Sequence, residues 1–116
     1  MNVEKENIAL LVGQISDSNL YKEVTLQVKK DFELIGQTID IDEFIEPADF
    51  IKEVYQQIHH LLRHSFDTYL QLLYRVDIPE KLMNFNIQNS DDIAKTTTFY
   101  ILHREWEKVK LRTNFK

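Results

Sequence analysis

Hydrophobic residues recur every three or four positions along most of the chain, which is the spacing of one face of an α-helix. The pattern predicts a first helix from Val3 to Ser16 and a second from Leu20 to Ile35, joined as a tight helical hairpin. Gly36 follows the second stripe, where a helix commonly ends. Asp31 falls beside that stripe, and the pattern leaves open whether it is buried with a counter-ion.

Between residues 37 and 46, apolar and acidic residues partly alternate, which is a strand signal. A lone strand would have no partner within the chain and would be unstable. We therefore expect an extended connector whose Ile39, Ile41 and Phe44 side chains pack on the helices. The alternative is a short strand that pairs across a dimer.

The longest apolar stripe runs from Pro47 to Val76 and predicts one continuous helix, because no strong helix breaker interrupts it. A helix of this length suggests the axial helix of a bundle. It is expected to end before Pro79, since the residue that precedes a proline disfavours the helical conformation. A short helical turn is predicted between Pro79 and Phe85.

The last predicted helix runs from Asp91 to Leu111, with Ser90 as its N-cap. Its main apolar stripe comprises Phe99, Leu102, Trp106 and Val109. A second apolar face, predicted on roughly the opposite side, comprises Ile93, Tyr100, Ile101 and Leu111. A chain this short has few spare segments to cover that second face, so we predict that it forms the interface of a homodimer.

These elements predict an all-α fold: a single domain, residues 1–116, built as an up-and-down bundle of four main helices with a short extra helical turn. The chain has 2 glycines and 2 prolines, too few for a fold of many short strands or for a glycine-rich phosphate loop. It has no cysteine, which excludes disulfides, thiolate metal sites and cysteine nucleophiles. No apolar run approaches the ~20 residues that span a bilayer, so we predict a soluble, cytoplasmic protein without membrane contact.

The net charge is −5 and is unevenly distributed. Residues 37–53 carry six acids and one base, whereas residues 90–116 carry six bases and four acids. The overall sign argues against a dedicated nucleic-acid binder. Arg104, Lys108 and Arg112 nevertheless form a basic ridge, and a weak contact with nucleic-acid phosphates is one interpretation. The other is that they solubilise the helix and complement its C-terminal dipole.

Histidines provide the one candidate for a metal site. His60 and His64 are four residues apart, a spacing that can hold a metal from one helix face, and His103 is the candidate ligand from another helix. The alternative is that these histidines are solvated surface residues. No metalloprotease, di-iron or serine-hydrolase motif is present, so we predict no catalytic residues and no cofactor.

The stretch from Leu72 to Glu80, followed by Arg104-Glu105 and Lys108-Val109, resembles short uncharacterised helical proteins of Bacteroidetes. The similarity covers roughly the last half of the chain, and that group carries no assigned activity, so the resemblance implies no mechanism. The sequence therefore predicts a non-enzymatic protein-interaction or homo-oligomerisation module. A metal-binding bundle and a weak nucleic-acid binder remain the alternatives, and an unidentified protein partner remains open.

Overall fold

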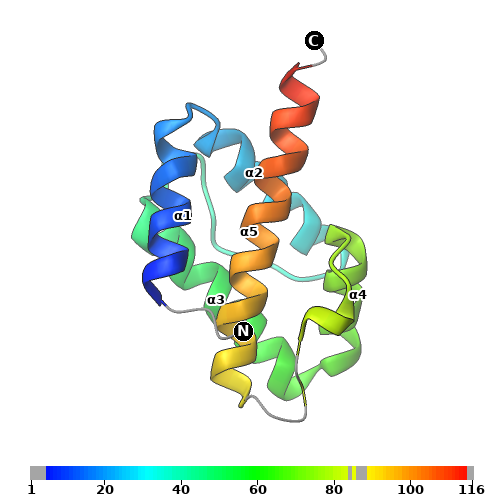
Figure 1. Cartoon of the computed structure of the whole chain (residues 1–116). Helices are drawn as coiled ribbons and strands as arrows, with labels where there is room; N and C mark the ends of the chain where they lie inside the picture. Colours follow the sequence, from blue (N-terminus) through cyan, green and yellow to red (C-terminus); the bar gives the residue numbers. More distant parts are fainter. Residues whose placement is uncertain (1–4, 84, 86–88, 115–116) are drawn as a thin grey trace.

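The computed structural model describes residues 5–83, 85 and 89–114, and over these residues the chain forms five α-helices and one 3-10 turn (Figure 1). The elements are α1 (Lys5–Asp17), α2 (Tyr21–Leu34), α3 (Pro47–His64), α4 (Phe66–Val76), the 3-10 turn η1 (Glu80–Leu82) and α5 (Ser90–Asn114). The prediction of an all-α fold is confirmed for this part of the chain. The predicted start of the first helix at Val3 lies outside it.

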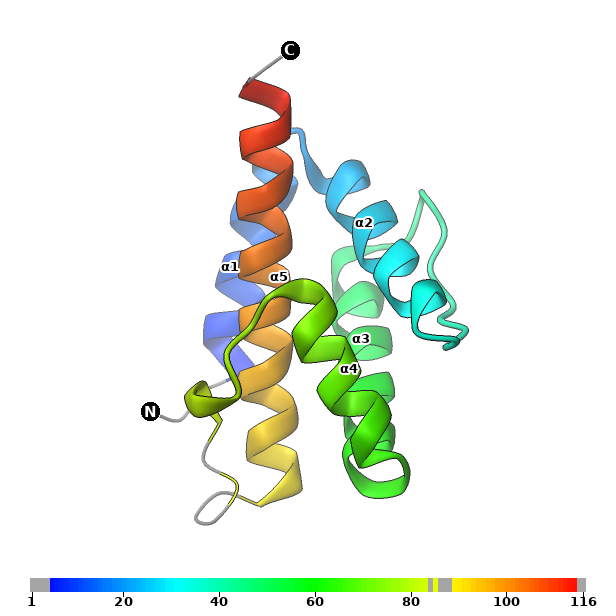
Figure 2. The same cartoon turned by 90° about the vertical axis from the view of Figure 1, so that its right-hand side faces the viewer.

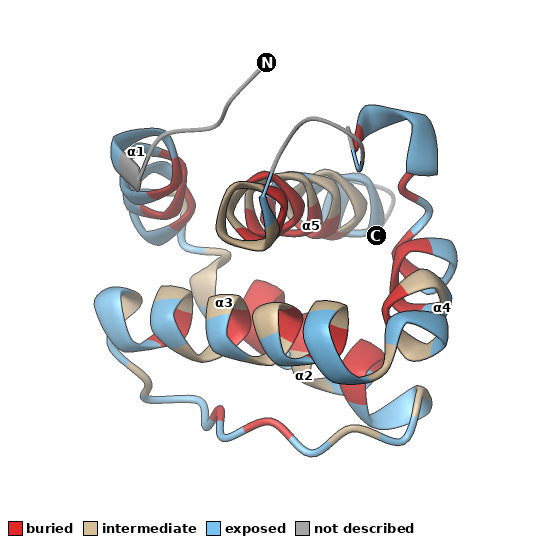
Figure 3. Ribbon diagram, turned by 90° about the horizontal axis from the view of Figure 1, so that it is seen from below, coloured by how far each residue is buried: buried red, intermediate tan, exposed pale blue. Residues whose placement is uncertain are grey.

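The central element is α5, which packs against each of the other four helices. Seen end-on, it lies between α1 and α4, with α3 along a third side (Figure 3). The sequence had predicted instead that residues 47–76 form the axial helix. Among the described residues, no helix is both long enough and apolar enough to cross a membrane.

The apolar stripes of α1, α2, α3 and α4 form the core. The large side chains that are less than 2% exposed include Ile15, Phe32, Phe50, Ile58, Leu61, Tyr69, Leu72 and Leu73. They come from all four helices and pack around the buried face of α5. Removal of this apolar area from water, at about 25 cal/mol per Å², is the main source of stability that such a bundle has.

The predicted continuous helix from Pro47 to Val76 is interrupted at Ser65, which adopts φ −154° and ψ 67°. The amide of Ser65 donates to the carbonyl of Leu61 (2.8 Å), and its own carbonyl accepts from the amide of Tyr69 (3.0 Å). A straight 30-residue helix would be ~45 Å long, longer than the largest extent of the molecule, 41 Å. The break lets α4 fold back onto α2 and α5 and bury its own apolar stripe.

The helices do not alternate in direction, so the predicted up-and-down arrangement is not what the chain adopts. In Figures 1 and 2, α1 and α5 lie beside one another and run the same way. After α4, residues 77–83 run back along the bundle, and α4 and α5 also run the same way (Figure 2). This return carries η1, the short helical turn predicted after Pro79.

The connector at residues 37–46 contains no strand and is extended, as expected. Ile39 and Ile41 are buried, which confirms that they pack on the helices. Phe44 is 82% exposed, so its predicted packing is wrong. It lies in a tight turn, where its amide bonds the side chain of Asp42 (2.8 Å). The hydroxyl of Tyr21 donates to the carbonyl of Ile45 (2.6 Å) and ties the connector to α2.

Two helix ends show how local sequence sets the boundaries. Gly36 follows α2 with φ +80°, a conformation that glycine adopts without steric cost, and confirms the predicted stop. At the start of α5, the side chain of Asn89 accepts from the amide of Asp92 (2.8 Å). Asn89, one residue before the predicted Ser90, therefore provides the cap.

Candidate functional site

The predicted metal-binding histidines do not converge. His60 and His64 lie together on the exposed side of α3, with ring centroids 4.7 Å apart. His103, on α5, pairs with Glu107 (Nδ1 to Oε1, 3.3 Å) and stacks on the ring of Phe99. Within the described part of the chain, no group of three or more histidine or acidic side chains could hold a metal ion. The three histidines of the predicted metal site therefore lie on two different helices and do not form one site.

The four predicted interface residues do not form one exposed face. Ile93 and Ile101 are buried within the single chain, and Tyr100 is half-buried against Phe99. Leu111 is 54% exposed, close to the C-terminal end of α5. The buried side of α5 includes Ile101, because α5 is enclosed by four neighbouring helices rather than lying on the outside of the bundle.

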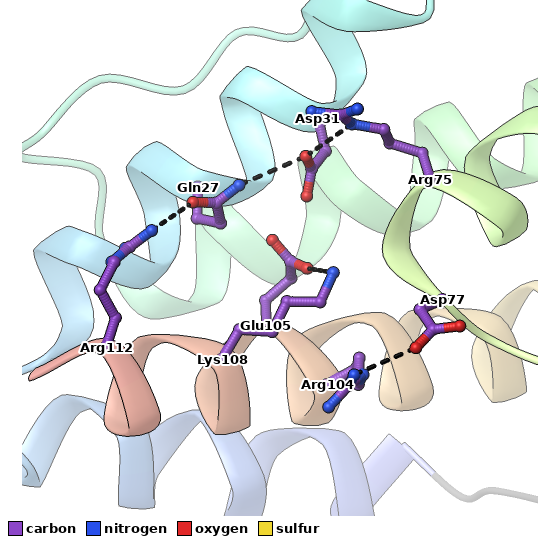
Figure 4. A network of polar contacts seen from close by, with 8 residues as sticks. All are labelled: Gln27, Asp31, Arg75, Asp77, Arg104, Glu105, Lys108 and Arg112. Atoms are coloured by element: carbon purple, nitrogen blue, oxygen red, sulfur yellow. Dashed lines mark hydrogen bonds and ion pairs between the residues drawn. The ribbon is translucent and has the colours of Figure 1, made fainter. Parts of the chain in front are cut away.

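Each residue of the predicted basic ridge contacts a polar group of the same chain (Figure 4). Arg104 Nη2 lies 3.1 Å from Asp77 Oδ2, and Lys108 Nζ lies 3.2 Å from Glu105 Oε1. Arg112 donates to Gln27 Oε1 (3.0 Å), which joins α5 to α2. These contacts hold the cationic groups against α2, α5 and the end of α4, so the ridge is part of the packing of α5 onto its neighbours.

The structure reveals a pair of buried acids that the sequence did not predict. Glu105 on α5 is 0% exposed and Asp31 on α2 is 3% exposed. Their carboxyl groups face one another across the contact between the two helices (Figure 4). We call them the Asp31–Glu105 pair. Two carboxyl groups that lie together out of water form an arrangement that must be stabilised by a proton or by cations.

Burial raises the pKa of Glu105 to about 8. The largest cause is the loss of hydration, which disfavours the ionised form, and the neighbouring carboxyl of Asp31 adds to it. The ammonium group of Lys108 opposes the shift, because a nearby positive charge favours the carboxylate. Burial and the neighbouring acid therefore both favour the neutral form of the Glu105 carboxyl.

Polar groups from three helices surround Asp31. Arg75, on α4, places Nε 3.4 Å from Asp31 Oδ1, and Gln27 donates to the same oxygen from one turn earlier in α2 (3.3 Å). The other oxygen, Asp31 Oδ2, is buried and has no hydrogen-bond partner. The question that the sequence left open is thus answered: Asp31 is buried, and Arg75 is its counter-ion.

A second polar cluster lies at the start of α5. The hydroxyl of Tyr55 donates to Asp91, and Lys95 pairs with the same carboxylate (3.0 Å). These contacts lower the pKa of Asp91, the bond from Tyr55 being the largest cause. A groove of about 820 Å³ between α1, α3 and α5 runs past the cluster, with Ile8 and Ile51 among its apolar lining residues. The polar groups beside the groove already bond one another.

A third feature is the outward surface of α4, which we call the α4 face. Apolar side chains occupy every fourth position, and a parallel row of polar side chains lies beside them. The apolar row is Phe66, Leu70 and Tyr74, and the polar row is Asp67, Gln71 and Arg75. Tyr74 is 89% exposed and Phe66 is 43% exposed. Together with Ile35 of α2, the central part of this face lines a shallow cavity of about 550 Å³.

Sequence reasoning missed Glu105 although a signal was present. It is four residues after Ile101 and four before Val109, so it shares a helix face with two apolar residues. The α4 face was missed because residues 47–76 were treated as one helix, whose polar side was taken to be solvated.

Comparison of the chain with protein-family models, with curated proteins and with solved structures finds no match.

Proposed function

We propose that this protein is a non-enzymatic homo-oligomerisation module in which α4 packs against the α4 of a second copy. The observation that carries the proposal is the apolar row of the α4 face, whose two end residues, Phe66 and Tyr74, are exposed. Tyr74 leaves almost its whole side chain in water, and Phe66 is more than two-fifths exposed. Contiguous exposed aromatic and aliphatic groups commonly mark a protein interface, where tyrosine is enriched. The proposal replaces the face of α5 that the sequence suggested.

The arrangement of charges on the α4 face favours a second copy of the chain as the occupant. Asp67 lies at one end of the polar row, Arg75 at the other and the uncharged Gln71 between them. If two copies of α4 meet antiparallel about a two-fold axis near Gln71, Asp67 of each copy lies beside Arg75 of the other. The same operation brings Leu70 onto the other copy's apolar row. A surface that complements itself in this way suits an isologous dimer.

The size of the α4 face indicates a weak dimer. α4 has 11 residues and is ~16 Å long, so a contact through this helix falls at the low end of the range of specific interfaces, below ~1,200 Å². We therefore expect association that depends on concentration. Location in the cytoplasm belongs to the same proposal, because a chain without cysteines needs no oxidising compartment.

Disulfide cross-linking tests the geometry directly, because the natural chain has no cysteine. Gln71→Cys places a thiol near the proposed two-fold axis, where it meets its own copy. We expect a covalent dimer under mild oxidation. Gln14→Cys, at an exposed position on α1, is the matched control and should cross-link far more slowly. Equal rates for the two variants would contradict the proposal.

Mass measurements test the energetics. Light scattering over a concentration series should show an average mass that rises above the 13.9 kDa of one chain. Leu70→Lys should abolish the rise by placing two like charges near the axis. Leu10→Lys, which changes a 64%-exposed leucine on α1, should leave it unchanged. A constant mass of one chain, combined with no preferential cross-linking of Gln71→Cys, would reject self-association through α4.

A further inference from the structure

We propose that Asp31 and Glu105 share one proton in the folded protein, and that this proton makes the packing of α2 on α5 sensitive to rising pH. The pair joins α2 to α5, and its two residues are 74 positions apart in the sequence. It lies at the place where Arg75 of α4 also meets α2 (Figure 4). A change in its charge therefore acts on the contact between three helices.

The hydrogen-bond inventory of the pair supports a shared proton. Asp31 Oδ2 and both carboxyl oxygens of Glu105 are buried and have no hydrogen-bond partner. Two ionised carboxylates can only accept, so neither can satisfy the other. A proton on Glu105 turns one of its oxygens into a donor to Asp31. That single proton gives partners to one oxygen of each acid and removes one of two buried negative charges.

The cations near the pair do not make this proton unnecessary. Arg75 reaches Asp31 Oδ1 at 3.4 Å, but not the unpartnered Oδ2, and its side chain is 48% exposed. Lys108 Nζ is 3.2 Å from Glu105 Oε1, an ion-pair distance whose geometry does not make a hydrogen bond. Screening by water weakens such partly exposed partners. One negative charge on the pair, rather than two, therefore fits the surroundings.

Few other groups near the pair change charge between acid and mildly alkaline pH. From α2, the neighbouring polar side chain is Gln27, which does not titrate. From α4 and α5 come the basic side chains of Arg75 and Lys108. The side chains that α1 and α3 bury are apolar over the described residues. A pH effect at this contact in that range therefore reports on the pair.

The direction of the effect follows from linkage. In the unfolded chain, the pKa of Glu105 has its ordinary value of 4.5, and in the folded protein this pKa is raised to about 8. Between these values, the folded state holds a proton that the unfolded state has lost, so rising pH favours unfolding. The unfolding equilibrium constant should rise up to ~10-fold per pH unit over this window, and the effect should level off above about pH 8.

Urea unfolding at a series of pH values, followed by circular dichroism, tests the proposal. Glu105→Gln keeps the shape and supplies an amide donor to Asp31 without an ionisable proton. Its stability relative to wild type should therefore increase as pH rises from about 5 to about 8. Glu33→Gln, the same substitution at an exposed position on α2, is the control and should follow wild type. A constant difference between Glu105→Gln and wild type across this window would overturn the proposal.

Infrared spectroscopy of the wild-type protein provides a test that does not depend on any variant folding. Near pH 6 most carboxyl groups are ionised, so a shared proton should give a carbonyl band of a protonated carboxylic acid. The band should disappear as the pH passes about 8 and should be absent from Glu105→Gln. A folded wild-type protein without this band near pH 6 would show that both acids are ionised and would reject the shared proton.

Discussion

The buried contact between Tyr69 and Thr97 should respond differently according to which hydroxyl group is removed. Both side chains are fully buried, and their hydroxyl oxygens are 2.7 Å apart, joining α4 to α5. The Thr97 hydroxyl also lies 2.7 Å from the carbonyl of Ile93, one turn earlier in α5. Thr97 has one proton, and we assign it to that carbonyl, so Tyr69 is the donor to Thr97 Oγ1. Burial raises the pKa of Tyr69 to about 12, so its hydroxyl keeps its proton.

The magnitudes follow from the partner that each substitution leaves behind. Thr97→Val keeps the shape of the side chain but leaves the Tyr69 hydroxyl buried without an acceptor, which should cost ~1–3 kcal/mol of unfolding free energy. Tyr69→Phe removes the donor, while Thr97 keeps its bond to Ile93, so the cost should be only ~0.5–1.5 kcal/mol. The double variant leaves no orphaned hydroxyl and should be less destabilised than the sum of the two single changes.

Urea unfolding of wild type, both single variants and the double variant measures all four free energies at one pH. The slope m should stay constant, because none of these changes alters the surface exposed on unfolding. The expected order of destabilisation places Thr97→Val above Tyr69→Phe. If Tyr69→Phe proves the more costly change, or if the two effects add, the assignment of donor and acceptor is incorrect.

Three further predictions test the packing of the chain and its ion binding. Gly13→Ala should stabilise the protein by about 0.5–1 kcal/mol, because a Cβ at this position in α1 meets no atom within 4 Å. Gly36→Ala should destabilise the protein by about 1 kcal/mol, because the φ angle of Gly36 is +80°. The urea midpoints of the two variants would show whether the two effects have opposite signs. Ile41→Ala should cost about 2–5 kcal/mol if the connector is part of the core, and a loss under 1 kcal/mol in the same assay would contradict that role. Zinc or nickel should shift the melting temperature of wild type no more than that of a His60→Ala, His64→Ala double variant, and a larger shift in wild type would demonstrate metal binding that involves the pair.

Helix positions could be predicted from the sequence because amphipathic periodicity is a local property. The apolar stripe of α2 and the stop at Gly36 follow from residues within one or two turns. The break at Ser65 could not be predicted in this way, since serine is not a strong helix breaker and the apolar stripe continues past it. What ends α3 there is tertiary: α4 gains burial on α2 and α5 only if the chain turns.

The buried acids show the same limit for the candidate site. Asp31 could be singled out because it lies beside an apolar stripe within its own helix. Its partners could not, since Arg75 is 44 residues away and Glu105 is 74 residues away, and no local spacing links them. Glu105 also lies directly after Arg104, in a stretch of the chain rich in charged residues. Only the position of α5 inside the bundle turns it into a buried acid.

The central position of α5 also changes what its two apolar sides mean. A helix that is apolar on two sides must be covered on both, and a second copy of the chain was one way to cover it. The structure provides another, because four helices of the same chain enclose α5 and bury both Ile93 and Ile101. An interface with a partner is then expected on a helix that keeps apolar groups on its outer side. α4 is such a helix: it packs on α2, α3 and α5 through one side and keeps Tyr74 89% exposed and Phe66 43% exposed on the other. Its polar row complements itself under a two-fold rotation, so the α4 face, rather than α5, is where self-association should be sought.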